Sequence, residues 1–499
     1  MLRMLVALAS VVSAGLVEAQ TRDDLAAAVA AVEASAPAAL VRHGVPGVAV
    51  AMVIDGEPVW AGGFGVADVE TGARVTADSV FEIASVTKPV TAWAMLRLAE
   101  EGRIDLDAPI ETYLGGWTLP PSEFDHSGVT GRSILAHGAG LGAGGDSGGP
   151  PAASVPTLVE AANGAGMEYG PIRVTHPPGE AYHYSSKGFV LLEMAVETIT
   201  GEPFALYVTR EVLDPLGMTD SSFGWTPGLE ARAAWGHDWY GRRLPHYSHA
   251  TKAQGGIVAT ATDVAKFLAA SMSGPDGVEP GRGVISPGSV KATFTPFPFE
   301  ADQSAVGLGY NLHLDGETLV ARKSGDHRGY KAIVFSMPEI GAGLVILANS
   351  DRAAPGIFAD IACPWSEALP GNPMRNVCGQ LRTLRNAHWF AGGIAALIGL
   401  LISGRVVVDL RRRKRDGPRQ SSALRRVFAL LLLALLMGWW VYWYSDIPLR
   451  LQGFPPTFYT VRATLWPTAF VWVSLGLSAL IAGVCLAVLS PRKPGQTRA

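Results

Sequence analysis

The stretch Phe81-Glu82-Ile83-Ala84-Ser85-Val86-Thr87-Lys88-Pro89 leads into a long helical pattern that extends from Ser85 to Glu101. Because Ser85 and Lys88 are three positions apart, a helix places them on one face, within reach of each other. A serine at a helix N-terminus benefits from the positive end of the helix dipole as its oxygen gains charge. A neighbouring lysine accepts the serine proton only when it is neutral, so burial or nearby cations must lower its pKa. The alternative is a serine cap beside an exposed lysine.

Two later segments could complete a site around this pair. Tyr184-Ser185-Ser186 precedes an apolar helical run, and Lys323-Ser324-Gly325 ends a strand pattern. A tyrosine can serve as a base or proton relay if adjacent lysines lower its pKa. Lys323 and Ser324 would then supply a cation and a hydroxyl for a substrate carboxylate. The backbone N–H groups of Ser85 and Asp326 would form an oxyanion hole.

These three ordered segments resemble the motifs of the serine β-lactamase and penicillin-binding-protein superfamily, in its class C β-lactamase-like branch, which includes D-amino-acid peptidases and esterases. The likeness covers about residues 24 to 352. The resemblance implies that Ser85 is the acylated nucleophile, Lys88 its proton acceptor and Tyr184 the second acid/base. The flanking stretches that carry the resemblance are 81–89, 101–107, 213–219, 253–256 and 345–349.

Departures from the family pattern leave the substrate class open. Ser186 stands where the family usually has an asparagine that contacts the substrate amide. Lys323 keeps a cation that favours substrates with a carboxylate, whereas Asp326 and His327 stand where small hydroxyl residues are common. A β-lactam, a D-amino-acid peptide and an ester therefore all remain candidates.

The predicted elements indicate an α/β (α+β) fold. Strands at both ends of the globular part and helices between them predict one sheet built from N- and C-terminal segments, with a helical insertion. The resemblance likewise implies an antiparallel sheet flanked by helices beside a helical region. The expected strands are 47–53, 58–65, 305–314, 318–323, 331–337 and 343–349, and the expected helices are 21–43, 85–101, 154–162, 189–200, 203–213 and 261–272.

Two other patterns are interpreted as structural. Residues 145–150, Gly-Asp-Ser-Gly-Gly-Pro, spell a protease-like nucleophile motif, but glycines before the serine and prolines after it argue against the strand and helix that a nucleophile elbow needs. We interpret them as a Gly-rich loop. His246 and His249 have a possible ligand spacing, but the sequence shows no carboxylate or cysteine partner for them, so we expect no metal and no cofactor.

Charge is divided unevenly along the 499 residues, which are 48% hydrophobic and 17% charged with a net charge of −4. From His388 onward there are 14 basic and 3 acidic residues, and the remainder has 26 basic and 41 acidic residues. An acidic globular part with a basic, apolar tail argues against a simple soluble enzyme. The net negative charge of the globular part also argues against nucleic-acid binding.

The tail predicts a membrane anchor at residues 388–499. Its apolar runs, at about 389–408, 427–444 and 465–489, are each near the ~20 residues that a membrane-spanning helix needs. The alternative is buried core helices. Because the loop that begins with the basic run 411–415 should stay cytoplasmic, we expect the preceding domain outside and the C-terminus in the cytoplasm.

The start of the chain resembles a secretory signal. Arg3 precedes an apolar run, and Ala19 suits cleavage before residue 20, so we predict a signal peptide at 1–19, with an uncleaved anchor as the alternative. A hydrolase domain at 20–352 and a linker at 353–387 would follow. In an oxidising compartment Cys363 and Cys378 could form a disulfide worth ~3 kcal/mol, the alternative being two free thiols.

Together these patterns predict a membrane-anchored, extracytoplasmic serine hydrolase that works through an acyl-enzyme on a small molecule or peptide. The other hypothesis is a catalytically idle membrane receptor that binds cell-wall fragments or β-lactams. Intact Ser85, Lys88 and Tyr184 favour the enzyme, and a cytoplasmic loop too short for a signalling domain argues against the receptor.

Overall fold

The computed structural model describes residues 24–146, 148–149, 154–353, 355–380 and 382–383, and isolated positions between 393 and 408. The predicted signal peptide, most of the first predicted span and all of the second and third lie outside the described residues. The described chain forms two units, of which the first comprises residues up to 353 together with 357–376.

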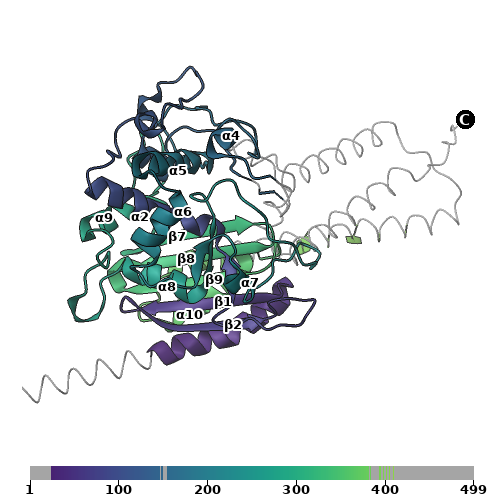
Figure 1. The fold of residues 1–499 in the computed structure, drawn as a ribbon. Helices are drawn as coiled ribbons and strands as arrows, with labels where there is room; N and C mark the ends of the chain where they lie inside the picture. The colour runs from purple at the N-terminus through teal and green to yellow at the C-terminus, as the bar shows by residue number, and fades with distance from the viewer. Residues whose placement is uncertain are drawn as a thin grey trace, which may run out of the picture. The chain divides into compact units, whose positions relative to one another are not determined.

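A six-stranded antiparallel sheet with the order β2-β1-β9-β8-β7-β6 is the centre of the first unit (Figure 1). Its outer strand β2 and central strand β1 come from the N-terminal part, and the other four come from the C-terminal part. This confirms the predicted assembly from two distant segments. The strands are β1 (Gly47–Ile54), β2 (Glu57–Gly65), β6 (Asn311–Asp315), β7 (Thr318–His327), β8 (Tyr330–Met337) and β9 (Ala342–Ala348).

The strand boundaries follow local backbone chemistry. β1 and β2 meet at Asp55-Gly56, whose φ angles of 51° and 69° suit the tight hairpin turn that Asp-Gly favours. The strand expected at 305–314 begins only at Asn311, because Gly309 has a φ of 85° and interrupts the extended backbone. β7 extends to His327, beyond the predicted end at 323.

Helices surround the sheet, and one layer of them leads to the candidate site. α8 packs on β1, β2 and β9, and α2 contacts α5, α6 and α9. The long helices α2 and α5 bury most of their residues, in agreement with their apolar sequences. The helices are α2 (Thr87–Glu100), α3 (Gly131–Leu135), α4 (Leu158–Ala162), α5 (Lys187–Thr200), α6 (Phe204–Val208), α7 (Pro227–Glu230), α8 (Ala261–Ala270) and α9 (Pro287–Thr293).

A second, three-stranded sheet, which the sequence did not predict, lies next to the start of α2. Its order is β3 (Val80–Glu82), β5 (Ile257–Thr260) and β4 (Ser221–Phe223). Strands of three or four residues are too short to give a recognisable alternation. The sheet matters for the site because β3 runs directly into the Ser85 turn.

The predicted linker 353–387 is in part a helix of the same unit. α10 (Pro355–Ala368) buries Ile357, Ile361 and Trp365 completely. Its Asp360 accepts hydrogen bonds from Arg42 at 2.5 Å and His43 at 3.0 Å. A boundary at 352 is therefore too early, because the apolar face of α10 needs the domain for its burial. Cys363 and Cys378 are both disulfide-bonded, which is one of the two states that the sequence left open for them.

One helix in the described part of the chain, Asp24–His43, is long and apolar enough to cross a membrane by length and composition. Its side chains Ala28, Val32 and Ala36 are fully buried in the unit. Because only 28% of its most apolar 18-residue window is buried, one face of this helix packs on the unit and the rest is exposed.

Candidate active site

Ser85 lies on a strained turn between β3 and α2. The short 3-10 helix Ala84–Val86 precedes α2 and places Lys88 in the first helical turn. Ala84 has a φ of 48°, a conformation that is unfavourable for a residue with a side chain. Strain of this kind persists only where the surroundings hold it, and such positions cluster at functional sites.

β7 passes so close to this turn that one of its residues must be glycine. A Cβ atom on Gly325 would lie 2.1 Å from the Ile83 carbonyl oxygen and 3.2 Å from the Ala84 Cβ. This close approach gives a physical reason for the glycine of Lys323-Ser324-Gly325. It also brings the end of β7 beside the nucleophile turn, as the predicted site requires.

The hydroxyl of Ser85 contacts both predicted acid/base groups. Lys88 Nζ donates a hydrogen bond to Ser85 Oγ at 2.9 Å, and the Tyr184 hydroxyl lies 3.0 Å from the same oxygen. Lys88 Nζ also donates to the backbone oxygen of Gln254 at 2.6 Å. Ser85, Lys88 and Tyr184 therefore form one hydrogen-bonded group in the geometry that nucleophilic catalysis needs.

Tyr184 lies between two buried lysines. The Nζ atoms of Lys88 and Lys323 are 5.6 Å and 4.9 Å from the centre of its ring. Burial alone would raise the pKa of Tyr184, but the charges of Lys323 and Lys88 and hydrogen bonds from Ser85 and Ser186 outweigh it and lower the pKa to about 6. Burial lowers the pKa of Lys88 to about 8, with Tyr184 opposing and Lys323 reinforcing that shift.

These pKa values change the expected division of roles. Between pH 6 and 8 they favour a Tyr184 phenolate facing a Lys88 ammonium. The phenolate is then the group that can accept the Ser85 proton, whereas Lys88 holds Ser85 Oγ as a donor. Lys88 accepts a proton only after it has lost its own.

The remaining predicted site residues separate into two groups. Ser186, the residue before α5, makes no side-chain hydrogen bond that caps the helix, and its side chain contributes to lowering the pKa of Tyr184. Lys323 is 4% exposed and likewise faces Tyr184. By contrast, the Asp326 carboxylate forms an ion pair with Lys331 on β8 and is largely exposed. Ser324 lies on β7 between Lys323 and Asp326. The oxyanion-hole role of the Ser85 and Asp326 amides stays a prediction.

The Gly-rich loop that spells a protease motif forms a wall of this site. The Ser186 amide donates to the Gly144 carbonyl oxygen at 3.0 Å, and a Cβ atom on Gly145 would lie 2.6 Å from both Ser186 and Gln254. Asp146 exchanges two hydrogen bonds with the Gln254 side chain. The loop is built around the site, so glycine is needed there for close packing.

The sequence analysis did not identify Glu193, which holds the segment before Gln254, whose carbonyl oxygen accepts the hydrogen bond from Lys88. Glu193 on α5 is buried and accepts hydrogen bonds from the amides of Lys252 at 2.6 Å and Ala253 at 2.8 Å. Thr91 donates to the Ala253 carbonyl oxygen at 2.7 Å. Burial raises the pKa of Glu193 to about 8. The available signal was an acidic residue within the most apolar part of the helical pattern.

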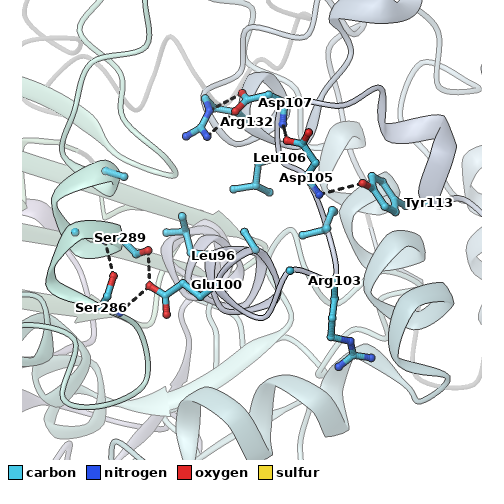
Figure 2. A pocket seen from close by; sticks show the side chains of 15 residues that line it. Leu96, Glu100, Arg103, Asp105, Leu106, Asp107, Tyr113, Arg132, Ser286 and Ser289 are labelled. Atoms are coloured by element: carbon cyan, nitrogen blue, oxygen red, sulfur yellow. Dashed lines mark hydrogen bonds and ion pairs between the residues drawn. The ribbon is translucent and has the colours of Figure 1, made fainter.

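A cavity of about 700 Å³ lies away from Ser85 (Figure 2). It is bounded by the end of α2, the segment 102–107 and α9. Its charged residues are already paired: Glu100 accepts from Ser286 and Ser289, and Arg132 binds Asp107 in a bidentate pair. None of the residues that contact Ser85 lines it.

Comparison with known proteins agrees with this geometry. A family model described as Beta-lactamase matches residues 21–361. A curated human protein, "Putative beta-lactamase-like 1", is 30% identical over 420 residues, which are 79% of this chain and 80% of that protein.

Solved structures show the same fold. The octameric penicillin-binding protein homologue from Pyrococcus abyssi is 27% identical, with a TM-score of 0.58 over 69% of this chain and 78% of that one. The D-amino acid amidase from Ochrobactrum anthropi SV3 is 25% identical, with a TM-score of 0.57 over 68% and 98%. The chain, with Ser85, Lys88 and Tyr184 assembled on this fold, belongs to the beta-lactamase family of serine hydrolases.

Proposed function

We propose that this protein is a membrane-anchored, extracytoplasmic hydrolase that cleaves an amide or ester through an acyl-enzyme on Ser85. The observation that carries the proposal is the double contact of Ser85 Oγ, with Lys88 Nζ at 2.9 Å and Tyr184 OH at 3.0 Å. A serine that only capped a helix would need neither contact. A receptor that only bound its ligand would gain nothing from a tyrosine with a lowered pKa.

The proposed reaction has two steps. The Tyr184 phenolate takes the Ser85 proton as Oγ bonds to the substrate carbonyl carbon, and the N–H groups of Ser85 and Asp326 stabilise the resulting oxyanion. The bond between the carbonyl carbon and the leaving nitrogen or oxygen then breaks, and Tyr184 gives its proton to the leaving amine or alcohol. Water attacks the acyl-enzyme in the second step, with Tyr184 accepting its proton and returning one to Ser85.

A D-amino-acid amide or peptide is the substrate class that we put first. The support is the likeness to a D-amino acid amidase over nearly its whole length. β-Lactams and simple esters are the two other candidates, because all three substrates present a carbonyl carbon to the same nucleophile. The Ser186 side chain acts on Tyr184 and carries no amide group that could contact a substrate amide. This favours a substrate whose side chain is bound elsewhere.

The test of the nucleophile uses the full-length chain in membranes. A fluorescent penicillin and a fluorescent fluorophosphonate are applied to wild type and Ser85→Ala. Ser289→Ala, which changes a serine that bonds to Glu100 away from the site, is the matched control of the same residue type. We expect covalent labelling of wild type and Ser289→Ala only. Labelling that persists in Ser85→Ala would overturn the assignment.

The substrate class is then decided by turnover. Purified wild type in detergent is offered D-phenylalanine amide, a D-Ala-D-Ala peptide, a chromogenic cephalosporin and a p-nitrophenyl ester. We expect the highest kcat/KM on one of the first two. No turnover of any substrate, together with saturable ligand binding, would favour the receptor hypothesis.

The proposed anchor rests on the tail's charge and apolar pattern. Among its described positions, Leu397, Leu400 and Leu401 are helical and more than half exposed, which suits side chains that face lipid. Carbonate extraction should leave the protein in the membrane fraction. Protease added outside intact cells or spheroplasts should remove the hydrolase domain and spare a tag at the C-terminus.

A further inference from the structure

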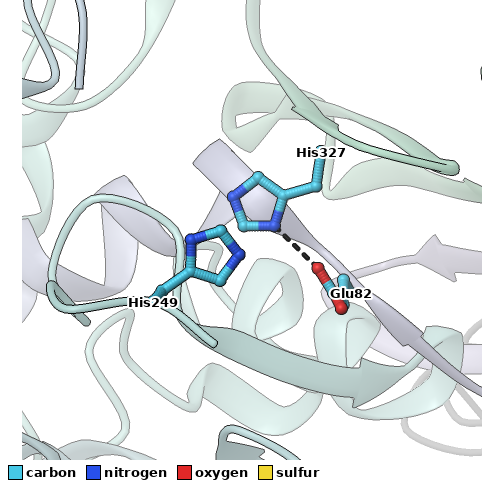
Figure 3. A group of neighbouring side chains, drawn as sticks. All are labelled: Glu82, His249 and His327. Atoms are coloured by element: carbon cyan, nitrogen blue, oxygen red, sulfur yellow. Dashed lines mark hydrogen bonds and ion pairs between the residues drawn. The ribbon is translucent and has the colours of Figure 1, made fainter. Parts of the chain in front are cut away.

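Three side chains that are far apart in the sequence meet beside the nucleophile turn (Figure 3). Glu82 is on β3, His249 is on the segment that precedes β5, and His327 is the last residue of β7. Each offers one potential ligand atom, and these three atoms lie within 4.8 Å of one another. Sequence reasoning found no carboxylate for His249, because Glu82 is far away along the chain.

The Glu82–His327 part of this cluster is already joined. His327 Nδ1 and Glu82 Oε2 are 2.8 Å apart, and Trp225 Nε1 donates to the other carboxylate oxygen at 3.2 Å. Glu82 is 6% exposed. The cluster therefore contains a buried carboxylate that is in contact with an imidazole and an indole N–H.

His249 is the incomplete member of the cluster. Both of its ring nitrogens are buried, and neither has a hydrogen-bond partner within the described residues. Its ring stacks on His327 with a centroid distance of 4.5 Å and an interplanar angle of 18°. Burying such a group without a partner is costly, which points to a ligand.

We propose that Glu82, His249 and His327 bind one divalent transition-metal ion, with Zn²⁺ as the best match. Two imidazoles and one carboxylate are a donor set that zinc uses, with bonds of about 2.0 to 2.2 Å. Asp146 Oδ2 lies 3.8 Å from His249 Nδ1 and accepts a hydrogen bond from the Thr251 amide, and it is not one of the three grouped ligands. Binding requires the His249 ring to rotate out of its stack, and this breaks no hydrogen bond.

An ion at this position would connect three segments that surround Ser85. His327 Nε2 lies 2.9 Å from the position of a Cβ atom on Gly255, and the Ala84 carbonyl carbon lies 3.3 Å from the same position. The ion would therefore hold the end of β7, the 246–252 segment and β3 against the strained turn. We assign it this structural role, which is independent of the hydrolysis proposed above.

The experiment measures zinc binding directly. The full-length protein, purified in detergent with a tag that contains no histidine, is stripped with chelator and titrated with Zn²⁺ in a calorimeter. We expect one ion per chain and a rise in melting temperature with Zn²⁺. His249→Ala should weaken binding at least tenfold, as should Glu82→Gln. A Co²⁺-loaded sample should give the visible absorption of a low-coordinate site, and His249→Ala should remove it.

The control is the other stacked histidine pair of the domain. His176 and His183 are 3.8 Å apart at 15°, but His183 belongs to no group of three potential ligands in the described chain. His183→Ala should bind Zn²⁺ like wild type. Equal affinities in wild type and His249→Ala, or no binding by wild type, would overturn the proposal. Because circular dichroism reports folding separately, a variant that merely unfolds is recognised.

Discussion

Lys323 and Lys331 lie on the neighbouring strands β7 and β8, and they are 4% and 8% exposed. Lys331 forms ion pairs with Asp326 and, at 3.5 Å, with Asp351. Lys323 faces Tyr184, and no ion pair in the described part of the chain includes it. Burial lowers the pKa of both lysines, but the two carboxylates reverse the effect at Lys331, whose pKa is raised.

The difference teaches that burial alone does not decide what a lysine does in this sheet. Near Ser85 the positive charges of Lys88 and Lys323 have no carboxylate partner among the described residues, and they favour a negative charge on Tyr184. Asp326 and Asp351 neutralise the positive charge of Lys331 on the neighbouring strand β8. These ion pairs connect the start of β8 to the end of β7 and to the segment after β9. Function and stability are thus divided between lysines of the same burial.

The largest effect on activity is expected when Lys88, one of the two lysines beside Tyr184, is replaced. Lys88→Met should reduce acylation of Ser85 by about a thousandfold or more, because Ser85 Oγ loses its donor and Tyr184 loses a cation. The measurement is the rate of fluorophosphonate labelling, with circular dichroism as the folding control. A loss of less than tenfold would show that the Ser85–Tyr184 contact is sufficient by itself.

Replacing Lys323 tests whether its charge acts through Tyr184. Lys323→Met should raise the pKa of Tyr184 and move the acid limb of the pH–rate profile by at least about one unit toward alkaline pH. A one-unit shift should reduce kcat/KM by about tenfold on the acid limb below pH 6, but by only about twofold at pH 7. A rise in KM at an unchanged pH profile would instead favour the predicted role in binding a substrate carboxylate.

The wild-type pH profile is a third test. Since Tyr184 must be deprotonated, kcat/KM for a neutral substrate should rise as the pH passes about 6. It should fall above about 8, as Lys88 loses the proton that it donates to Ser85. Each limb should change by about tenfold per pH unit. A profile that keeps rising through pH 8 would assign the base to neutral Lys88.

The smallest effect on activity is expected at the paired lysine. Lys331→Met should change the labelling rate by only a few-fold, but it should destabilise the fold because Asp351 loses its partner. We expect roughly 2 kcal/mol, less than for a fully buried pair because Asp326 is largely exposed. Urea unfolding of the detergent-solubilised protein measures this loss of stability. An unchanged midpoint would contradict the stabilising role that distinguishes Lys331 from Lys323.

How much the sequence predicts depends on how local each signal is. Ser85 and Lys88 were predictable because one helical turn relates them. Tyr184 and Lys323 were found only by resemblance to a family, since nothing local reveals which distant strand and turn meet the helix. The predicted role of Lys323 was incomplete for the same reason, because its burial against Tyr184 depends on the assembled sheet.

Other parts of the molecule gave no usable local signal. The strands β3, β4 and β5 are three or four residues long, and α10 follows a strand pattern without a clear cap. Glu193 reaches the Lys88 acceptor only through two backbone amides on another segment. Likewise, Glu82, His249 and His327 come from segments that only the tertiary fold brings together.

The order of strands in the large sheet also constrains when this domain can form. β1, made early, needs β9 as its neighbour, and β9 is made almost 300 residues later. Contacts of such long range slow folding, because the intervening chain must be ordered before they form. If the chain is exported as we propose, β1 leaves the membrane with one edge unpaired and must wait for β9. The sheet is therefore completed only just before the first predicted span emerges, so secretion and folding must be matched in time, and a holding chaperone outside the membrane would have an edge strand to protect.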